Sequence, residues 1–454
     1  MKTHKTLLIY IFLFLFIFGC GRTGYYISPP TPISTGTPHI EREILENGMT
    51  LLILERHSLP ILTVDIKLRG GAMYDTERLA GIANLTSKLL TEGTVRRTAT
   101  QISEEIDFIG GRLTTLCGDD YAGARLTILK KDIDTGFDLL SDILMNPAFR
   151  EEEISKKRDR ILAGIIQEKE DPGSVASRAF YNMVFDGHPY HRPVKGFAET
   201  LPEIKQKDIF SFYNRYYQPN NLIMAIAGDI TRDEALSIVR KYFGKWEKRP
   251  IDFPAFASPS ISDKKRVKIV DKDITQANIF LGGLGIERTH PDYYSVRLMN
   301  HILGGGGFSS RLMNNIRDDL GLVYSIYSHF GMKVYSGTFF VNLQTKNESA
   351  NQAIEEVIKE MRRIRSDMVS DEELRDAKSY ITGNFPLRID TNSKAAGILT
   401  SIEFYNLGID YFEEFPKGIN AVTKEDVLKA ARKYLNPDNY ILVVVANKDK
   451  AKIK

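Results

Sequence analysis

A histidine pair and one cysteine are the residues whose types and positions could support chemistry. His188 and His191 lie in the segment GHPYH, and their H-x-x-H spacing could hold a metal ion. Pro189 between them favours a turn instead, and the sequence offers no evident third ligand. Cys117 has no nominated histidine partner, so we interpret it as a small packed residue rather than a nucleophile. These residue types alone predict no catalytic centre.

The elements around these residues mix strands with helices. The apolar runs MTLLILERH and ILTVDIKLRGG are typical of two strands, and GGRLTTLCG and YAGARLTILK are typical of a strand pair. The spacing of apolar residues predicts helices over about 79–90, 100–109, 132–145, 152–170 and 205–217. Short connections favour antiparallel pairing. We therefore expect an α+β fold built on mainly antiparallel sheets packed with helices.

An internal repeat joins the two ends of this body. IKQKDIFSFYNRYYQPNNLIMAIAGD begins at Ile204, and VTKEDVLKAARKYLNPDNYILVVVAN begins 218 residues later at Val422. In both segments an amphipathic helix is stopped by a proline, Pro219 or Pro437, and an apolar strand follows. Chance similarity between helices would not reproduce this order of events, so we expect two homologous domains.

Composition bounds the function class and the compartment. The chain has 454 residues and a net charge of only +3, which suggests neither nucleic-acid binding nor an acidic tail. The basic start and the apolar run TLLIYIFLFLFIFG, ending at Cys20, predict a lipoprotein signal peptide over residues 1–20. An uncleaved short anchor is the alternative. Because lipidation of Cys20 leaves Cys117 alone, no disulfide framework is expected.

These observations divide the chain into five predicted segments. After the signal, residues 21–40 are rich in Gly, Pro, Ser and Thr and predict a flexible linker. Residues 41–247 and 263–454 are the two expected domains, and the Pro- and Ser-containing stretch 248–262 is the expected connection between them. The body is expected outside the cytoplasm, lipid-anchored to the bacterial cell envelope, most simply at the periplasmic face of the outer membrane.

Several spaced stretches resemble one family in the same order. The stretches are GGAMYDTERLAGIAN, LLTEGT, DFIGGRL, NPAF, PYHRPVKG, YYQPNNLIMAIAGD and GGGGFSSRLMNNIRDDLGLVYSIYS. Over nearly the whole length after residue 40, the chain resembles the M16 peptidases, which include insulinase, pitrilysin and the mitochondrial processing peptidase. The resemblance implies two M16-type α/β domains, in an arrangement of the M16B type.

Active members of that family hold zinc with H-x-x-E-H on one helix and a Glu on a later helix. Alignment on Gly81-Ile82-Ala83 places Asn84 and Lys88 at the histidine positions and Ser87 at the position of the catalytic Glu. The later Glu lies eight positions before the Pro of a D-P pair, which here is Pro172 and points to Gly164. The resemblance therefore implies a degenerate zinc site, with no metal held by this chain.

A shift of one helical turn would bring Glu168 towards that site. Asn84 and Glu168 would still be a poor pair for zinc, because they lack imidazole and the Lys88 ammonium would repel the cation. We interpret Lys88 as a surface charge or as a partner of Glu168.

The segment GGGGFSSRLMNNIRDDLGLVYSIYS keeps a second family motif. In related enzymes an Arg and a Tyr of this motif hold substrate near the metal of another half, and the matching positions are Arg311 and Tyr324. A guanidinium can donate to a peptide carbonyl, and a phenol can donate to a developing oxyanion. The alternative is structural, with Arg311 paired to Asp318 or Asp319 and Tyr324 packed in a strand.

Loss of one motif and retention of the other resembles the zinc-less subunit of heteromeric M16B peptidases. We expect a chain that is inactive alone and pairs with a zinc-bearing homologue to hydrolyse unfolded peptides. The alternative is a non-enzymatic scaffold or peptide-binding lipoprotein with the same fold.

Overall fold

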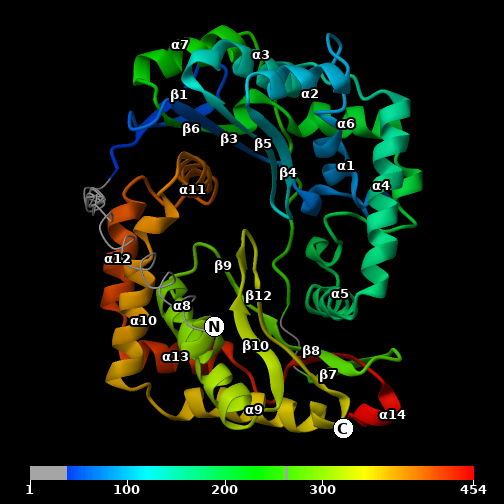
Figure 1. Cartoon of the computed structure of the whole chain (residues 1–454), viewed down its shortest axis with the longest axis vertical. Helices are drawn as coiled ribbons and strands as arrows, with labels where there is room; N and C mark the ends of the chain where they lie inside the picture. Colours follow the sequence, from blue (N-terminus) through cyan, green and yellow to red (C-terminus); the bar gives the residue numbers. More distant parts are fainter. Residues whose placement is uncertain (1–37, 261–263, 454) are drawn as a thin grey trace, which may run out of the picture. The chain divides into compact units, whose positions relative to one another are not determined.

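The computed structural model describes residues 38–260 and 264–453, which belong to one compact unit built on two large sheets (Figure 1). The predicted signal peptide, Cys20 and nearly all of the predicted linker 21–40 lie outside the described residues. Within the described ranges, no helix is long and apolar enough to cross a membrane.

The N-terminal sheet has six strands in the order β1-β2-β6-β3-β5-β4. Its strands are β1 (Glu41–Ile44), β2 (Thr50–Glu55), β3 (Ile61–Arg69), β4 (Arg112–Cys117), β5 (Tyr121–Leu129) and β6 (Leu222–Gly228). Only β2 and β6 pair in parallel, and the other neighbours are antiparallel. The predicted pairing of GGRLTTLCG with YAGARLTILK is therefore confirmed, with Leu113 opposite Leu126.

The C-terminal sheet has five strands in the order β10-β12-β8-β13-β7. Its strands are β7 (Arg266–Asp271), β8 (Gln276–Leu284), β10 (Val323–Phe330), β12 (Thr338–Lys346) and β13 (Ile441–Ala446). The short strands β9 (Ile286–Glu287) and β11 (Met332–Lys333) form a separate parallel pair. As in the first sheet, a single parallel pair, β13 with β7, lies among antiparallel neighbours.

The two sheets share one strand order, which gives the sequence repeat its structural meaning. If β1 is set aside, β2-β6-β3-β5-β4 corresponds in chain order and pairing to β7-β13-β8-β12-β10. The repeated helices are α6 (Gln206–Tyr216) and α13 (Lys424–Tyr434), and each leads through its proline into a central strand. Asp208 and Asp426 cap these helices in the same way, since each carboxylate accepts a backbone N–H three residues earlier at 3.0 Å.

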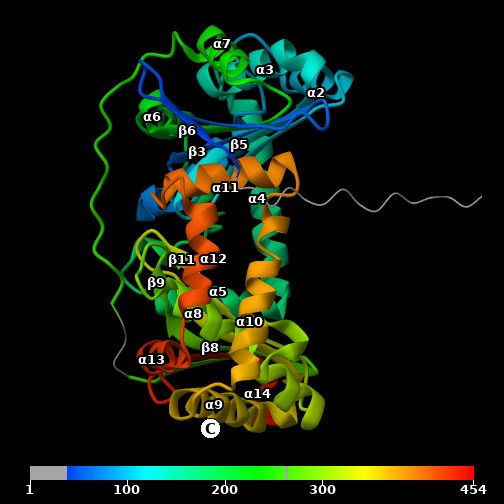
Figure 2. The same ribbon diagram turned by 90° about the vertical axis from the view of Figure 1, so that its left-hand side faces the viewer.

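Helices surround both sheets. In the N-terminal half they are α1 (Ile82–Leu89), α2 (Ala99–Phe108), α3 (Ile133–Met145), α4 (Glu151–Glu170), α5 (Pro172–Val184), α6 and α7 (Arg232–Phe243). In the C-terminal half they are α8 (Tyr293–Asn300), α9 (Ala350–Ser366), α10 (Asp371–Gly383), α11 (Asn392–Phe404), α12 (Tyr411–Ala421), α13 and α14 (Lys448–Ala451). The α+β fold class expected from the sequence is confirmed, and residues 246–260 run between the halves without helix or strand (Figure 2).

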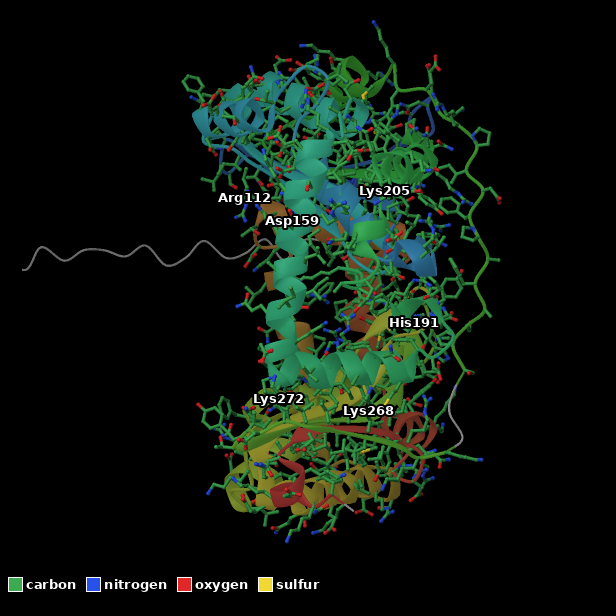
Figure 3. All side chains as sticks on the ribbon, turned by 90° about the vertical axis from the view of Figure 1, so that its right-hand side faces the viewer. Arg112, Asp159, His191, Lys205, Lys268 and Lys272 are labelled. Atoms are coloured by element: carbon green, nitrogen blue, oxygen red, sulfur yellow. The ribbon has the colours of Figure 1, made fainter. Side chains whose placement is uncertain are left out.

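Each half lends one helix to the sheet of the other half. Helix α11 lies against β3 and β6 of the N-terminal sheet, and α5 lies at the foot of α4 against β8 and β13 of the C-terminal sheet (Figures 1 and 3). Phe180 of α5 accordingly packs on Phe280 and Phe340, with ring centroids 5.7 and 5.9 Å apart. The hydrophobic core of each sheet therefore contains residues from both halves.

A buried polar cluster fixes α11 on the N-terminal sheet. The Asp65 carboxylate of β3 is fully buried, and it accepts hydrogen bonds from Arg125 Nε at 2.8 Å and Thr400 Oγ1 at 2.5 Å. Beside it, Lys67 Nζ donates to Ser401 Oγ at 2.5 Å and to the Gly397 carbonyl at 3.2 Å. Polar groups buried this deeply have to be paired, so the cluster specifies where α11 docks.

Lys67 should make this interface more stable in alkaline solution. Burial lowers the pKa of its ammonium from 10.5 to about 8, so the unfolded chain binds more protons here than the folded chain between these values. The free energy of unfolding should therefore rise with pH across this window, by about 3 kcal/mol relative to Lys67→Met. Urea unfolding of both chains from pH 8 to pH 10.5 measures this difference, and parallel pH dependences would contradict the prediction.

Candidate functional site

Helix α1 carries three of the four aligned zinc positions and is firmly placed. Gly81 precedes it with φ +100°, a conformation that side chains disfavour, and the Asp75 carboxylate accepts the N–H groups of Gly81 at 2.6 Å and Ala83 at 3.1 Å. Burial raises the pKa of Asp75 to about 7, although these two hydrogen bonds act in the opposite direction. The helix packs against α4, α6 and β4.

The side chains on α1 are poor donors for a metal. Asn84 is buried with a neutral amide, and the fully buried Ser87 hydroxyl donates to the Leu116 carbonyl at 2.9 Å. Lys88 is exposed and carries a positive charge. Of the two interpretations of Lys88, the surface charge is confirmed, and the pair with Glu168 is wrong because Glu168 forms its ion pair with Lys195.

Gly164 lies on α4, the helix that packs against α1. A Cβ atom built there meets nothing within 4 Å, so space for a larger side chain exists but no donor fills it. Zinc in proteins takes imidazole, thiolate or carboxylate ligands, and Asn84, Ser87, Lys88 and Gly164 supply none of them. These residues do not fit zinc. Across residues 38–260 and 264–453, no group of three or more His, Cys, Asp or Glu side chains is arranged to hold a metal.

The histidine pair and Cys117 are placed as packed residues. Pro189–His191 forms a 3₁₀ turn, in which buried His188 accepts the Tyr190 N–H at 3.2 Å and His191 Nε2 faces Glu77 at 3.4 Å. The turn predicted from Pro189 is confirmed. Burial raises the pKa of the Cys117 thiol well above its ordinary value, which disfavours the reactive thiolate.

Arg311 is largely buried and held by a carboxylate that the sequence did not indicate. Its Nε and Nη2 donate to the two carboxylate oxygens of Glu373 at 2.7 and 2.9 Å, so the predicted alternative partners Asp318 and Asp319 are wrong. Glu373 lies in the first turn of α10 and also accepts the Ser370 N–H at 2.8 Å. Arg311 Nη1 is buried and has no hydrogen-bond partner among the described residues, which leaves one donor unused.

Tyr324 is strongly exposed, with 77% of its surface accessible, compared with 43% for Tyr327 of the same strand. It lies in a β-bulge of the edge strand β10, since Val323 pairs with Thr345 and Ser325 already pairs with Gln344. A bulge turns a side chain out of the regular alternation and commonly occurs beside functional sites. The sequence alternative in which Tyr324 packs in the strand is wrong.

The chain between α8 and β10 is irregular on both sides of Arg311. Residues His301–Gly305 and Met313–Asp319 are π-helical, and both segments pack on β10. Such helices are rare and frequently lie at functional sites. Gly304 is required for this packing, because a Cβ there would lie 2.6 Å from the Ser328 nitrogen. Arg311 and Tyr324 therefore belong to one segment, residues 301–328, in which the irregular helices pack on the strand that carries Tyr324.

Sequence reasoning missed Glu373 and the bulge at Tyr324. Glu373 is 62 residues from Arg311, and no local pattern connects the two positions. The only available signal was its place three residues after Ser370, which predicts a helix cap rather than an arginine partner.

Comparison with known families covers both halves of the chain. Residues 51–196 match the family described as Insulinase (Peptidase family M16), and residues 203–381 match the Peptidase M16 inactive domain. Two relatives are named uncharacterized zinc proteases. The protein from Rickettsia felis is 28% identical over 75% of this chain and 81% of its own length. The one from Bacillus subtilis is 24% identical over 90% of this chain and 98% of its own length.

Solved structures show the same fold. A Pseudomonas fluorescens structure titled as a peptidase M16 inactive domain has a TM-score of 0.85 and 28% identity, and it covers 90% of this chain and 98% of its own. A Helicobacter pylori protease structure also has a TM-score of 0.85, at 20% identity, over 90% of this chain and 100% of its own. The architecture described above is therefore that of two M16 domains.

Proposed function

Because the chain belongs to the M16 peptidase family, we propose that it is the non-catalytic, substrate-binding subunit of a heteromeric M16B zinc metallopeptidase. Its partner in this proposal is a homologue that carries H-x-x-E-H and the zinc ion. The complex hydrolyses unfolded peptides at the bacterial cell envelope, where lipidated Cys20 attaches this subunit to the membrane. The relatives' names as zinc proteases support peptide hydrolysis as the reaction.

One contrast carries the proposal. The four positions aligned with the zinc site carry an amide, a hydroxyl, an ammonium and no side chain, so they have no zinc ligand. The region 301–328, in contrast, keeps two hydrogen-bond donors of the kinds that hold a peptide and its developing oxyanion. A chain that supplies donors without a metal fits the role of an assisting subunit.

In the proposed complex the two donors have different tasks. The exposed Tyr324 hydroxyl can reach a peptide on the surface and donate to the oxyanion. Arg311 retains Nη1 as its unused donor, while Glu373 fixes the other side of the guanidinium. Since Nη1 is buried, the segment covering it has to move before a peptide carbonyl can reach it.

A non-enzymatic scaffold or peptide-binding lipoprotein is the second candidate. The observation that favours it is the bidentate pair between Arg311 and Glu373, which alone is a sufficient structural reason for Arg311. In that case the chain would bind peptides without accelerating hydrolysis in any mixture.

The test is reconstitution with a zinc-bearing homologue encoded beside this chain. Each subunit is purified alone, its zinc content is measured, and cleavage of a quenched fluorescent peptide is followed for each subunit and for the mixture. We expect far less than one equivalent of zinc in this chain, no cleavage by it alone, and chelator-sensitive cleavage by the mixture. Chelator-sensitive cleavage by this chain alone would refute the proposal, and a mixture no faster than the partner alone would favour the scaffold.

A further inference from the structure

A cavity of about 570 Å³ lies beside α11, away from the zinc-aligned positions on α1 and α4. Its walls come from α11, the 3₁₀ turn Pro386–Arg388 before it, the start of α12, residues in and next to the β9–β11 pair, and Arg125 of the N-terminal sheet. This volume is in the range of sites that bind small organic groups. The cavity is therefore large enough for several atoms of a ligand rather than a single ion.

The lining of the cavity is strongly cationic. Four basic residues line it, and no Asp or Glu is among its described lining residues. The basic residues are Arg125, Arg288, Arg388 and Lys394. Two of these positive charges are neutralised by carboxylates outside the cavity lining. Arg125 pairs with Asp65 at 2.6 Å, and Lys394 pairs with Asp390 at 2.9 Å.

The other two charges are not offset. Within residues 38–260 and 264–453, no carboxylate lies within ion-pair distance of Arg288 or Arg388. A cavity with about two uncompensated positive charges favours an anion as its ligand. The basic lining therefore favours a negatively charged ligand.

Arg288 is already oriented for binding. Its guanidinium lies 4.0 Å from the ring centroid of Tyr293, and Nη2 donates to the Tyr411 hydroxyl at 3.1 Å. The other N–H groups of the Arg288 guanidinium have no hydrogen-bond partner among the described residues. An arginine held on aromatic rings loses little side-chain freedom when it binds a carboxylate.

The positive charge around Tyr293 changes the pKa of its phenol. Burial alone would raise the pKa of this phenol, but three neighbouring guanidinium groups lower it below its ordinary value. They belong to Arg297, Arg288 and Arg388. The three arginines therefore lie around one tyrosine, and none of them forms an ion pair within the described part of the chain.

Apolar and aromatic side chains complete the walls, including Met332, Ile398 and Tyr405. A site for inorganic phosphate would need only donors, whereas this mixture suits a carboxylate attached to an apolar chain. We propose that the cavity binds a carboxylate of the peptide substrate, either its C-terminus or an acidic side chain, through Arg288 and Arg388. The inference rests on the proposed function, because it takes the ligand to be that peptide.

The experiment measures binding by the full chain alone in detergent, using fluorescence anisotropy of short labelled Ala-Leu peptides. One peptide has a free C-terminal carboxylate, the second has a C-terminal amide, and the third has the amide and one internal Glu. We expect the amidated neutral peptide to bind at least about tenfold more weakly than the first. Tight binding of the third peptide would assign the site to any carboxylate, and weak binding would assign it to the C-terminus.

Two variants locate the binding. Arg388→Glu changes an exposed residue and should weaken binding of the carboxylate peptide more than tenfold, and Arg288→Gln should weaken it similarly if its thermal melting matches the wild type. Arg362→Glu is the control. Arg362 lies on α9, is not a lining residue of the cavity, and has an exposed side chain that pairs with Asp438. Equal binding of the carboxylate and amide peptides, unchanged binding by Arg388→Glu, or displacement of the peptide by equimolar phosphate would overturn the inference.

This binding assay contains no partner and no hydrolysis. Loss of binding in Arg388→Glu together with an inactive reconstituted mixture would leave the cavity assignment standing and refute the proposed function. An active mixture in which Arg388→Glu changes neither peptide binding nor KM would refute only the cavity assignment.

Discussion

Replacing Tyr324 with Phe should lower kcat/KM of the reconstituted peptidase by about two orders of magnitude. The change removes a single hydroxyl from a side chain that is 77% exposed and lies in a bulge of an edge strand. Loss of one oxyanion donor typically costs about 10²- to 10³-fold, and it acts mainly on kcat because the oxyanion exists only in the transition state. Steady-state kinetics with a quenched peptide measure the effect.

The matched control is Tyr327→Phe, which removes the same hydroxyl from an exposed tyrosine of the same strand. It should leave kcat/KM within about twofold of the wild type, since its ring packs on Phe340 and its hydroxyl has no assigned role. Arg311→Ala should also reduce activity, but it frees the Glu373 carboxylate and requires a melting curve beside the kinetics. Equal kinetics for Tyr324→Phe and Tyr327→Phe would exclude the oxyanion role.

Asp65→Ala should lower the free energy of unfolding by about 3 kcal/mol. The substitution leaves the Arg125 guanidinium without its carboxylate at the interface between β3 and α11. The buried Thr400 hydroxyl loses its contact with β3 and keeps only carbonyl acceptors within α11. Breaking a buried pair from one side costs more than the pair contributes, because an unpaired charge remains. The partial exposure of Arg125 keeps the estimate near the lower end of that range.

Urea unfolding measures this loss, and amide hydrogen exchange locates it. Exchange should accelerate first in α11, whose polar contacts with β3 are removed. Asp134→Ala is the control, since it breaks an exposed ion pair with Lys241 and should cost less than about 1 kcal/mol. Similar losses for both variants, or unchanged exchange in α11, would contradict the assigned role of Asp65.

Local patterns predicted the repeat and most strands and helices of the N-terminal half, because each depends on nearby residues. In the C-terminal half the repeat predicted helix α13 and strand β13. Pro219 and Pro437 stop equivalent helices wherever those helices dock, and the apolar runs 50–55 and 61–69 form strands because their side chains are buried almost continuously. Helix α5 was not predicted. Its small and mixed residues give a weaker pattern, and its buried face is defined by β8 and β13, two strands of the other half that lie far along the chain.

The candidate site was predictable only where the chemistry depends on residue type at a motif position. The absence of ligands at Asn84 and Gly164 follows from the letters of the sequence, whereas the Glu373 partner of Arg311 depends on how α10 packs. The cationic cavity could not be predicted, because Arg125 and Arg388 meet only after α11 docks on the opposite sheet. The sequence gives the type of each residue directly, but it does not show which residues become neighbours in the folded chain.

The exchange of α5 and α11 also determines what holds the two halves together. A cut within residues 248–260 would break the covalent connection but none of the contacts through which each half covers the other's sheet. The fragments should therefore stay associated and migrate apart only under denaturing conditions. Each fragment made alone would expose an apolar sheet face, so the chain is best regarded as one cooperative folding unit despite its duplicated plan.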